Sequence, residues 1–313
     1  MENALRSCLG KECGLTVEKV MKNNGVELTG LIFMKAGNDI ASTIYLDSFY
    51  EAYEKGRTMG ETVRRILEAY QAGKPEEKLD MSFFTDYKLV RKRLACRLIS
   101  FDKNAGLLEK TPYRKVLDLA VVYHCVLLRE DLGCACILIN KAHLAAWGIS
   151  EEELARDAEA NMPEILPPSL SSMGDFFRDM MKESLDGRAG ESLLPEYPSG
   201  GQMPEGLAGL LEDCSRQMEH RMLILSNIQH FYGASALLYP GLLERLAEER
   251  ACGFFILPSS VHEVILLADS GQEDPKGLSG MVREVNRENV PEEEFLSDHV
   301  YYYDKEGGFC IKS

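Results

Sequence analysis

Short runs of alternating apolar and polar residues dominate this chain, and apolar residues at helical spacing fill only the segments between them. Near the start, the runs 15–22, 27–35 and 40–46 are separated by Asn24-Gly25 and Gly37-Asn38, which are typical of tight turns. Because side chains in a strand alternate between two faces, this pattern predicts a β-meander after a short opening helix.

Helix-start signals follow the meander. Asp47 can cap a helix that runs through Tyr53, and Thr58 with Glu61 forms a capping box for a helix over 61–71. A second box, Ser150 with Glu153, predicts a helix that ends before Pro163. Between them we predict a helix over 83–98, a long apolar strand over 116–128 and a strand over 134–140 that forms a hairpin with it.

The last hundred residues predict a similar mixture. We expect strands at 222–226, 233–238, 254–257 and 264–267, helices after Pro240 and over 276–289, and a final hairpin of 300–303 with 308–311. Strands and helices do not alternate regularly, and neighbouring strands are joined as hairpins. The pattern therefore favours an α+β fold with mostly antiparallel or mixed sheets and flanking helices.

Prolines and glycines gather in the middle of the chain, in an acidic segment that includes Gly200-Gly201. This composition is typical of a linker. We therefore predict an N-terminal α+β sub-domain at 1–161, a Pro/Gly-rich acidic connector with short helices at 162–214, and a C-terminal α+β sub-domain at 215–313.

Composition narrows the class of protein. A net charge of −15 over 313 residues argues against a surface that neutralises nucleic-acid phosphates. No apolar run is long enough to span a membrane, and the start of the chain lacks the pattern of a signal peptide. Nine scattered cysteines fit reduced thiols, so we expect a soluble cytoplasmic protein. Glycine-rich phosphate-binding motifs are missing from the sequence, and we expect no cofactor.

The densest group of polar side chains in an apolar setting is Ser259, Ser260, His262 and Glu263. If this segment is an extended strand, Ser260 and His262 point the same way and could form a nucleophile–base pair, with Glu263 on the opposite face. Pro258 followed by serines is also ordinary turn chemistry. The four residues are therefore candidates for ligand binding, and Ser260 with His262 for catalysis, against the alternative of a plain turn.

Cysteines offer a weaker candidate site. If the strands over 116–128 and 134–140 pair, Cys125 could lie near Cys136, and Cys134 shares a face with Cys136. Three thiols within reach could bind a soft metal, although no C-x-x-C spacing accompanies them. Packing as small apolar side chains in the core is the alternative, and it predicts no metal.

Six stretches carry a resemblance to a known family: TIYLDSFYEAYEKG (43–56), LDLAVVYHCVLL (117–128), WGISEEEL (147–154), YGASALLYPGLLERLAEE (232–249), ILPSSVHEVI (256–265) and VREVNRENVPEEEFLSDHVYYYD (282–304). Together they resemble domain-of-unknown-function family 5688, a bacterial family, from about Gly30 to Tyr303. The Pro/Gly-rich segment 187–207 departs from it as a variable connector. The resemblance implies a small soluble bacterial protein and carries over no catalytic residue.

These observations favour a non-enzymatic module that binds an unidentified protein or small ligand, without nucleic acid or membrane as a partner. The alternative is a hydrolase-like enzyme that uses Ser260 and His262 in a cleft between the sub-domains. Contact between the Ser260 hydroxyl and the His262 ring distinguishes the two hypotheses.

Overall fold

The computed structural model describes residues 2–9, 13–35, 42–72, 82–129, 133–172 and 221–312. The chain divides into a first unit, Met1–Arg114 with Ala120–Asn161, and a second unit, Lys115–Leu119 with Met162–Ser313. Three antiparallel sheets with flanking helices confirm the predicted α+β class. Of the predicted connector, residues up to Ser172 belong to the second unit, and the remainder lies outside the described residues.

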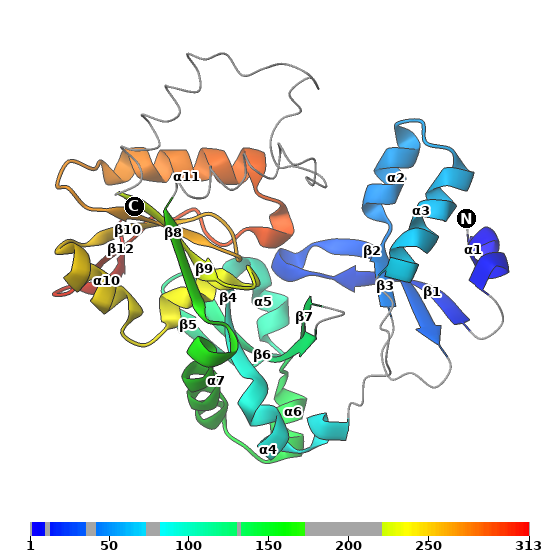
Figure 1. Ribbon diagram of the computed structural model, residues 1–313, viewed down its shortest axis with the longest axis horizontal. Coiled ribbons are helices and arrows are strands. Elements are labelled where there is room, and N and C mark those ends of the chain that lie inside the picture. The colour runs from blue at the N-terminus through cyan, green and yellow to red at the C-terminus, as the bar shows by residue number, and fades with distance from the viewer. Residues whose placement is uncertain are drawn as a thin grey trace. The chain divides into compact units, whose positions relative to one another are not determined.

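The first unit holds two of the three sheets and most of the helices among the described residues (Figure 1). Its elements in chain order are α1 (Glu2–Leu9), β1 (Cys13–Met21), η1 (Asn23–Gly25), β2 (Glu27–Lys35), β3 (Ser42–Tyr45), α2 (Asp47–Glu54), α3 (Met59–Ala72), η2 (Ser82–Thr85), α4 (Tyr87–Val90), η3 (Arg91–Arg93), β4 (Leu94–Ser100), η4 (Asp102–Asn104), α5 (Ala105–Leu108), β5 (Tyr113–Val116), β6 (Leu119–Arg129), β7 (Gly133–Leu138), α6 (Lys141–Trp147) and α7 (Glu151–Ile165). The chain crosses between the units within β5, at the start of β6 and within α7.

The predicted meander forms the three-stranded sheet β1-β2-β3. Asn24 and Gly25 both have positive φ, 60° and 73°, and Val26 N donates to Asn23 O, which is the type I′ turn that an Asn-Gly pair predicts. Helices α2 and α3 lie side by side against this sheet (Figure 1), and its core includes Leu15, Leu31, Phe33 and Ile66. The predicted capping box is confirmed, because Glu61 N donates to Thr58 Oγ1 and Thr58 N donates to Glu61 Oε2.

A pair of buried asparagines anchors the tip of the β1–β2 hairpin within the first unit. Asn104 Nδ2 donates to Asn24 Oδ1 at 2.8 Å and to Ser100 O at 2.8 Å, and Asn24 N donates to Asn104 Oδ1 at 2.9 Å. Each buried amide is thereby provided with partners, which removes the penalty of leaving a buried polar group unsatisfied.

Three of the predicted boundaries are wrong. The helix expected over 83–98 gives way at Leu94 to β4, which is buried on both faces, whereas an amphipathic helix would expose one side. Leu117, with a positive φ of 56°, separates β5 from β6 inside the expected long strand. Helix α7 continues past Pro163 to Ile165 and does not end before it. The predicted hairpin of β6 with β7 is confirmed.

The second unit is built on one six-stranded sheet in the order β13-β12-β10-β11-β9-β8. Its elements in chain order are β8 (Pro168–Ser172), β9 (Met222–Asn227), η5 (Gly233–Leu238), α10 (Leu242–Arg250), β10 (Phe254–Pro258), β11 (Val264–Ala268), α11 (Pro275–Asn289), η6 (Glu292–Glu294), β12 (Tyr301–Asp304) and β13 (Gly308–Ile311). The strand expected over 233–238 is instead the 3₁₀ segment η5, whose residues Gly233–Leu237 are buried.

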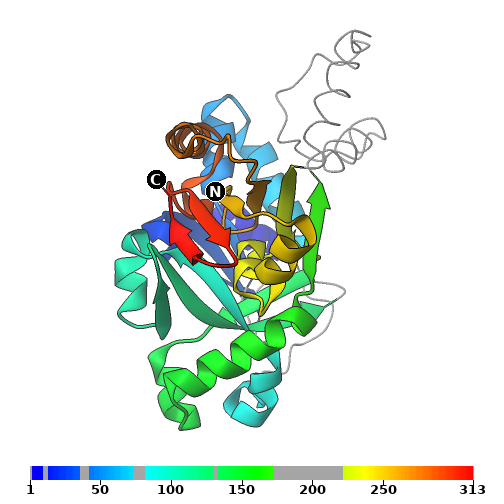
Figure 2. The same ribbon diagram turned by 90° about the vertical axis from the view of Figure 1, so that its left-hand side faces the viewer.

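Helix α11 packs on this sheet through an apolar cluster in which Val282 and Leu278 meet Phe255 and Leu257. Figure 2 looks down the axis of α11, beside the strands that it covers. Asp274 caps the helix by accepting hydrogen bonds from Lys276 N and Gly277 N. Strands β9 and β10 both pair antiparallel with β11, which lies between them, so they run in the same direction and the loops that follow them lie at the same end of the sheet.

Candidate functional site

Two loops of the second unit meet at one end of the six-stranded sheet. One loop, 228–232, follows β9, and the other, 259–263, joins β10 to β11. Val261 N donates to Glu294 O at 2.8 Å, so the segment η6 adjoins the second loop. We call these two loops together with Glu294 the loop junction.

The first loop is shaped by Asn227 and by two left-handed residues. Asn227 Oδ1 accepts hydrogen bonds from Gln229 N and Phe231 N, both at 3.1 Å, and Asn227 Nδ2 donates to Phe231 O at 2.9 Å. His230 and Tyr232 have φ values of 49° and 52°, a conformation that is costly for residues other than glycine. The loop is therefore held in one tight shape by its own asparagine.

The Ser260 hydroxyl belongs to the turn and not to a nucleophile–base pair. Ser260 Oγ accepts a hydrogen bond from the backbone N of His262 at 3.0 Å, and Ser260 N donates to Glu263 O at 3.2 Å. Ser260 is 9% exposed, and its hydroxyl makes no hydrogen bond to the His262 ring. Residues 259–263 form a loop and not the extended strand on which the pairing hypothesis depended, and the half-buried Ser259 lies at its start.

The His262 ring is instead fixed by the first loop. It stacks on Tyr232 with the ring centroids 5.4 Å apart and the planes inclined by 12°. Its Nδ1 lies 3.3 Å from Tyr232 N and 3.1 Å from His230 O, and its Nε2 lies 4.0 Å from Glu294 Oε1. The imidazole therefore holds the two loops together and turns its other nitrogen toward a carboxylate.

Glu263 is the least satisfied charged group of the loop junction. Its side chain is partly buried, and burial raises the pKa of its carboxyl group, with His230 and His262 opposing the shift and Glu294 adding to it. No side chain or backbone group among the described residues forms a hydrogen bond or ion pair with this carboxylate. A carboxylate withdrawn from water without a partner lowers the stability of the folded chain.

The candidate cysteines do not share one face of the sheet. Cys125 pairs with Ile137 and Cys136 pairs with Val126, so Cys125 and Cys136 project from opposite faces of the β6–β7 hairpin. Burial raises the pKa of the Cys125 thiol to about 12. The side chain of Cys134 is outside the described ones. Within the described ranges, no group of three His, Cys, Asp or Glu side chains could hold a metal ion.

A cluster of polar side chains around Asp118 in the second unit has no signal in the sequence. The Asp118 carboxylate accepts hydrogen bonds from Ser297 Oγ at 2.7 Å and Tyr301 OH at 2.8 Å, and it lies 3.0 Å from His299 Nδ1. Although burial would raise the pKa of Asp118, the hydrogen bonds from Ser297, His299 and Tyr301 lower it below its ordinary value. These residues are separated by about 180 positions, and no local pattern reveals them.

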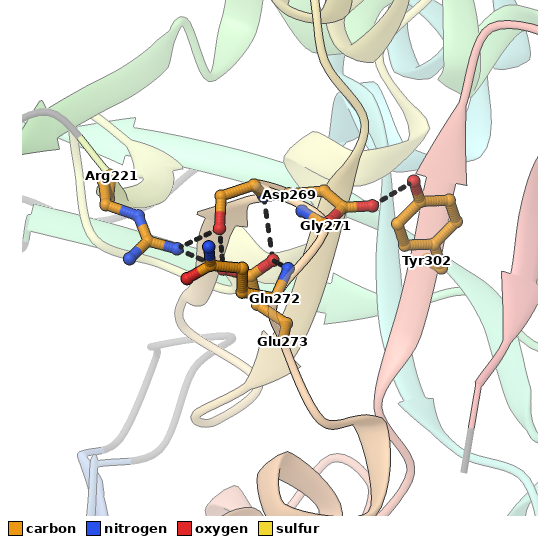
Figure 3. A network of polar contacts seen from close by, with 7 residues as sticks. Arg221, Asp269, Gly271, Gln272, Glu273 and Tyr302 are labelled. Carbon is orange, nitrogen blue, oxygen red and sulfur yellow. Dashed lines mark hydrogen bonds and ion pairs between the residues drawn. The ribbon is translucent and has the colours of Figure 1, made fainter.

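Another polar network closes the turn between β11 and α11 (Figure 3). Arg221 donates to Ser270 Oγ at 3.1 Å and forms an ion pair with Glu273, while Tyr302 OH donates to Asp269 Oδ2 at 2.7 Å. Burial would raise the pKa of Glu273, but hydrogen bonds that include those from Ser270 lower it to about 2. Each charged group in this network already has a partner within the unit, so the network stabilises the turn and offers no free group to a ligand.

Comparison with known proteins identifies the family but no relative of known activity. No curated protein and no solved structure matches this chain. None of the helices that the structure describes has the length and apolar character needed to cross a membrane. The model of one family, described as a family of unknown function (DUF5688), matches residues 1–305. The match confirms the resemblance seen in the sequence: this chain belongs to the DUF5688 family.

Proposed function

We propose that this chain is a non-enzymatic binding module that recognises a cationic group of a protein or small ligand at the loop junction. The carboxylate of Glu263 carries the proposal, because it is partly buried and has no partner among the described residues. An amine or guanidinium group would supply the missing charge and hydrogen bonds.

The surroundings of Glu263 suit such a ligand. Glu294 adds a second carboxylate, and the stacked rings of His262 and Tyr232 offer an aromatic surface beside it. Cations bind favourably both to carboxylates and to the faces of aromatic rings. The net charge of −15 would also raise the association rate of a positively charged partner.

The hydrolase alternative receives less support from the geometry. A nucleophilic serine requires a base within hydrogen-bond reach, and the Ser260 hydroxyl bonds to the backbone of His262 instead. We place the binding module in the bacterial cytoplasm as part of the same proposal, with no cofactor and with neither nucleic acid nor membrane as its partner. The net negative charge of the chain supports that placement, and so do the cysteines among the described residues, which are free thiols.

A titration with a simple cation tests this proposal. Butylguanidinium added to the full chain should shift the NMR signals of the His262 ring, and Glu263→Gln should weaken its binding at least tenfold, by about 1.4 kcal/mol or more. Binding should also weaken as the pH falls through the raised pKa of Glu263, because only the ionised carboxylate attracts a cation.

Two controls separate this effect from general electrostatics. Glu284→Gln removes one charge from an exposed position on α11 and should leave the affinity within about twofold. Butylurea has a similar shape without the charge and should not bind. Equal binding of both compounds, or equal weakening by both variants, would argue against recognition of a cation at Glu263.

A further inference from the structure

Strand β1 lies at an edge of the three-stranded sheet, where one side of its backbone has no neighbouring strand among the described residues. Such an edge can pair with an extended segment of another chain. The register of β1 with β2 pairs Val17 with Leu31, Lys19 with Thr29 and Met21 with Glu27. These pairs determine which backbone groups of β1 face the open side.

Two hydrogen bonds of Thr29 show which backbone groups of β1 point toward the open edge. Thr29 N donates to Asp47 Oδ2 and Thr29 O accepts from Leu46 N, so both backbone groups of Thr29 point away from β1. In an antiparallel ladder, the partner of such a residue also turns its N–H and C=O outward. The backbone N–H and C=O of Lys19 therefore face the open edge, and so do those of Val17 and Met21, two positions away on either side.

The same alternation includes Leu15, but its outward carbonyl is already occupied. Arg6 of α1 donates from Nη2 to Leu15 O at 2.7 Å. The open part of the edge is thus confined to Val17–Met21, in which no outward backbone group has a partner among the described residues.

The side chains along this open stretch alternate in chemistry. Val17 and Met21 are 46% and 63% exposed and lie on the same face of the strand as the core residue Leu15. Lys19 stands between them, and its contact with Glu27 is an exposed ion pair of 3.4 Å. Exposed pairs of this kind contribute little and are readily exchanged for another partner.

A second copy of this chain fits the edge poorly. Antiparallel pairing of the open stretch with itself would place Lys19 directly opposite Lys19, and like charges at opposed positions are unfavourable. A shift of the register in one direction brings in Leu15, whose carbonyl is bonded to Arg6. A shift in the other direction leaves Val17 without an opposite residue in the open stretch of the second copy.

We propose that the edge of β1 binds an extended segment of a partner protein by strand addition, with an acidic residue of that segment opposite Lys19. The segment carries apolar residues two positions before and after the acid, where they meet Val17 and Met21. Main-chain hydrogen bonds provide the affinity, and the alternating side chains provide the specificity. This surface belongs to the first unit and does not depend on the loop junction.

The capped peptide Thr-Val-Thr-Glu-Thr-Val-Thr and the same peptide with lysine at its centre test the proposal on the full chain. The acidic peptide should shift the amide NMR signals of Val17, Lys19 and Met21 and should bind at least tenfold more tightly than the lysine peptide. Lys19→Glu should reverse that preference. Val17→Pro should abolish binding of the acidic peptide with little change in melting temperature, because the N–H that it removes takes no part in the β1–β2 ladder.

The matched variant Thr16→Pro removes an N–H that faces β2, and it should lower the melting temperature. Equal binding of the two peptides, shifts confined to residues outside β1, or an unchanged preference in Lys19→Glu would each overturn the proposal. So would a dimer in sedimentation experiments that Val17→Pro dissociates, because it would show that a second copy occupies the edge.

Discussion

Replacing Gly233 by alanine is expected to destabilise the second unit by about 4 kcal/mol or more, enough to unfold much of it. A Cβ atom at this position would lie 2.5 Å from His262 O and 2.8 Å from Asn227 N, and closer still to Ser226 Oγ. Two of these three atoms are backbone, which cannot move aside as a flexible side chain can. Glycine is required at Gly233 because the loops of the junction approach each other there.

Gly280 provides the matched control for this substitution. It lies in α11, where a Cβ atom would meet no described atom within 4 Å apart from its chain neighbours and the backbone of its own helix, so Gly280→Ala should be neutral or stabilising by about 0.5–1 kcal/mol. Urea unfolding followed by circular dichroism measures the free energy of unfolding of both variants. A loss of less than about 1 kcal/mol in Gly233→Ala would show that the loops of the junction are not tightly packed.

Asp118→Ala is expected to lower the free energy of unfolding by about 3–5 kcal/mol. The substitution leaves Ser297 Oγ and Tyr301 OH without their acceptor, and both residues are almost completely buried, at 2% and 0% exposure. Tyr301→Phe removes only one donor and should lose about 1–2 kcal/mol.

The dependence on pH provides a second test of the Asp118 cluster. The folded-state pKa of Asp118 lies below its ordinary value, so the ionised carboxylate stabilises the fold above that ordinary value. This stability is lost as the pH falls through the folded-state pKa. The difference between wild type and Asp118→Ala in urea unfolding should therefore narrow in acid, and a difference that stays constant would mean that the charge of Asp118 does not stabilise the cluster.

Elements with local signals were predictable from the sequence. Asn24-Gly25 specifies its turn by backbone conformation, and Thr58 with Glu61 caps α3 through hydrogen bonds within a few residues. The predictions for β4 and η5 are wrong, because the conformation of both segments depends on burial against distant parts of the chain. Propensity is a weak guide where tertiary packing covers both faces of a segment.

The candidate site was predictable only in part. The segment Ser259–Glu263 stood out by its polar residues, but the sequence could not show that the partners of His262 are Tyr232 and Glu294, some thirty residues away on either side. The predicted pairing of Ser260 with His262 also depends on an extended strand, whereas residues 259–263 form a loop. Contacts of this range depend on the sheet register, which no local pattern contains.

The carboxylate of Glu263 is proposed to have no partner in the folded chain and to be available to a ligand. The most direct test compares the melting temperatures of Glu263→Gln and wild type across pH. Because burial raises the folded-state pKa of Glu263, the folded state binds the extra proton, and stability falls as the pH rises above the ordinary value of 4.5. Glu263→Gln should melt at a higher temperature than wild type at neutral pH, and the gap should close in acid, while Glu284→Gln shows no such gap. A variant that melts below wild type at neutral pH would show that the carboxylate is already paired within the fold.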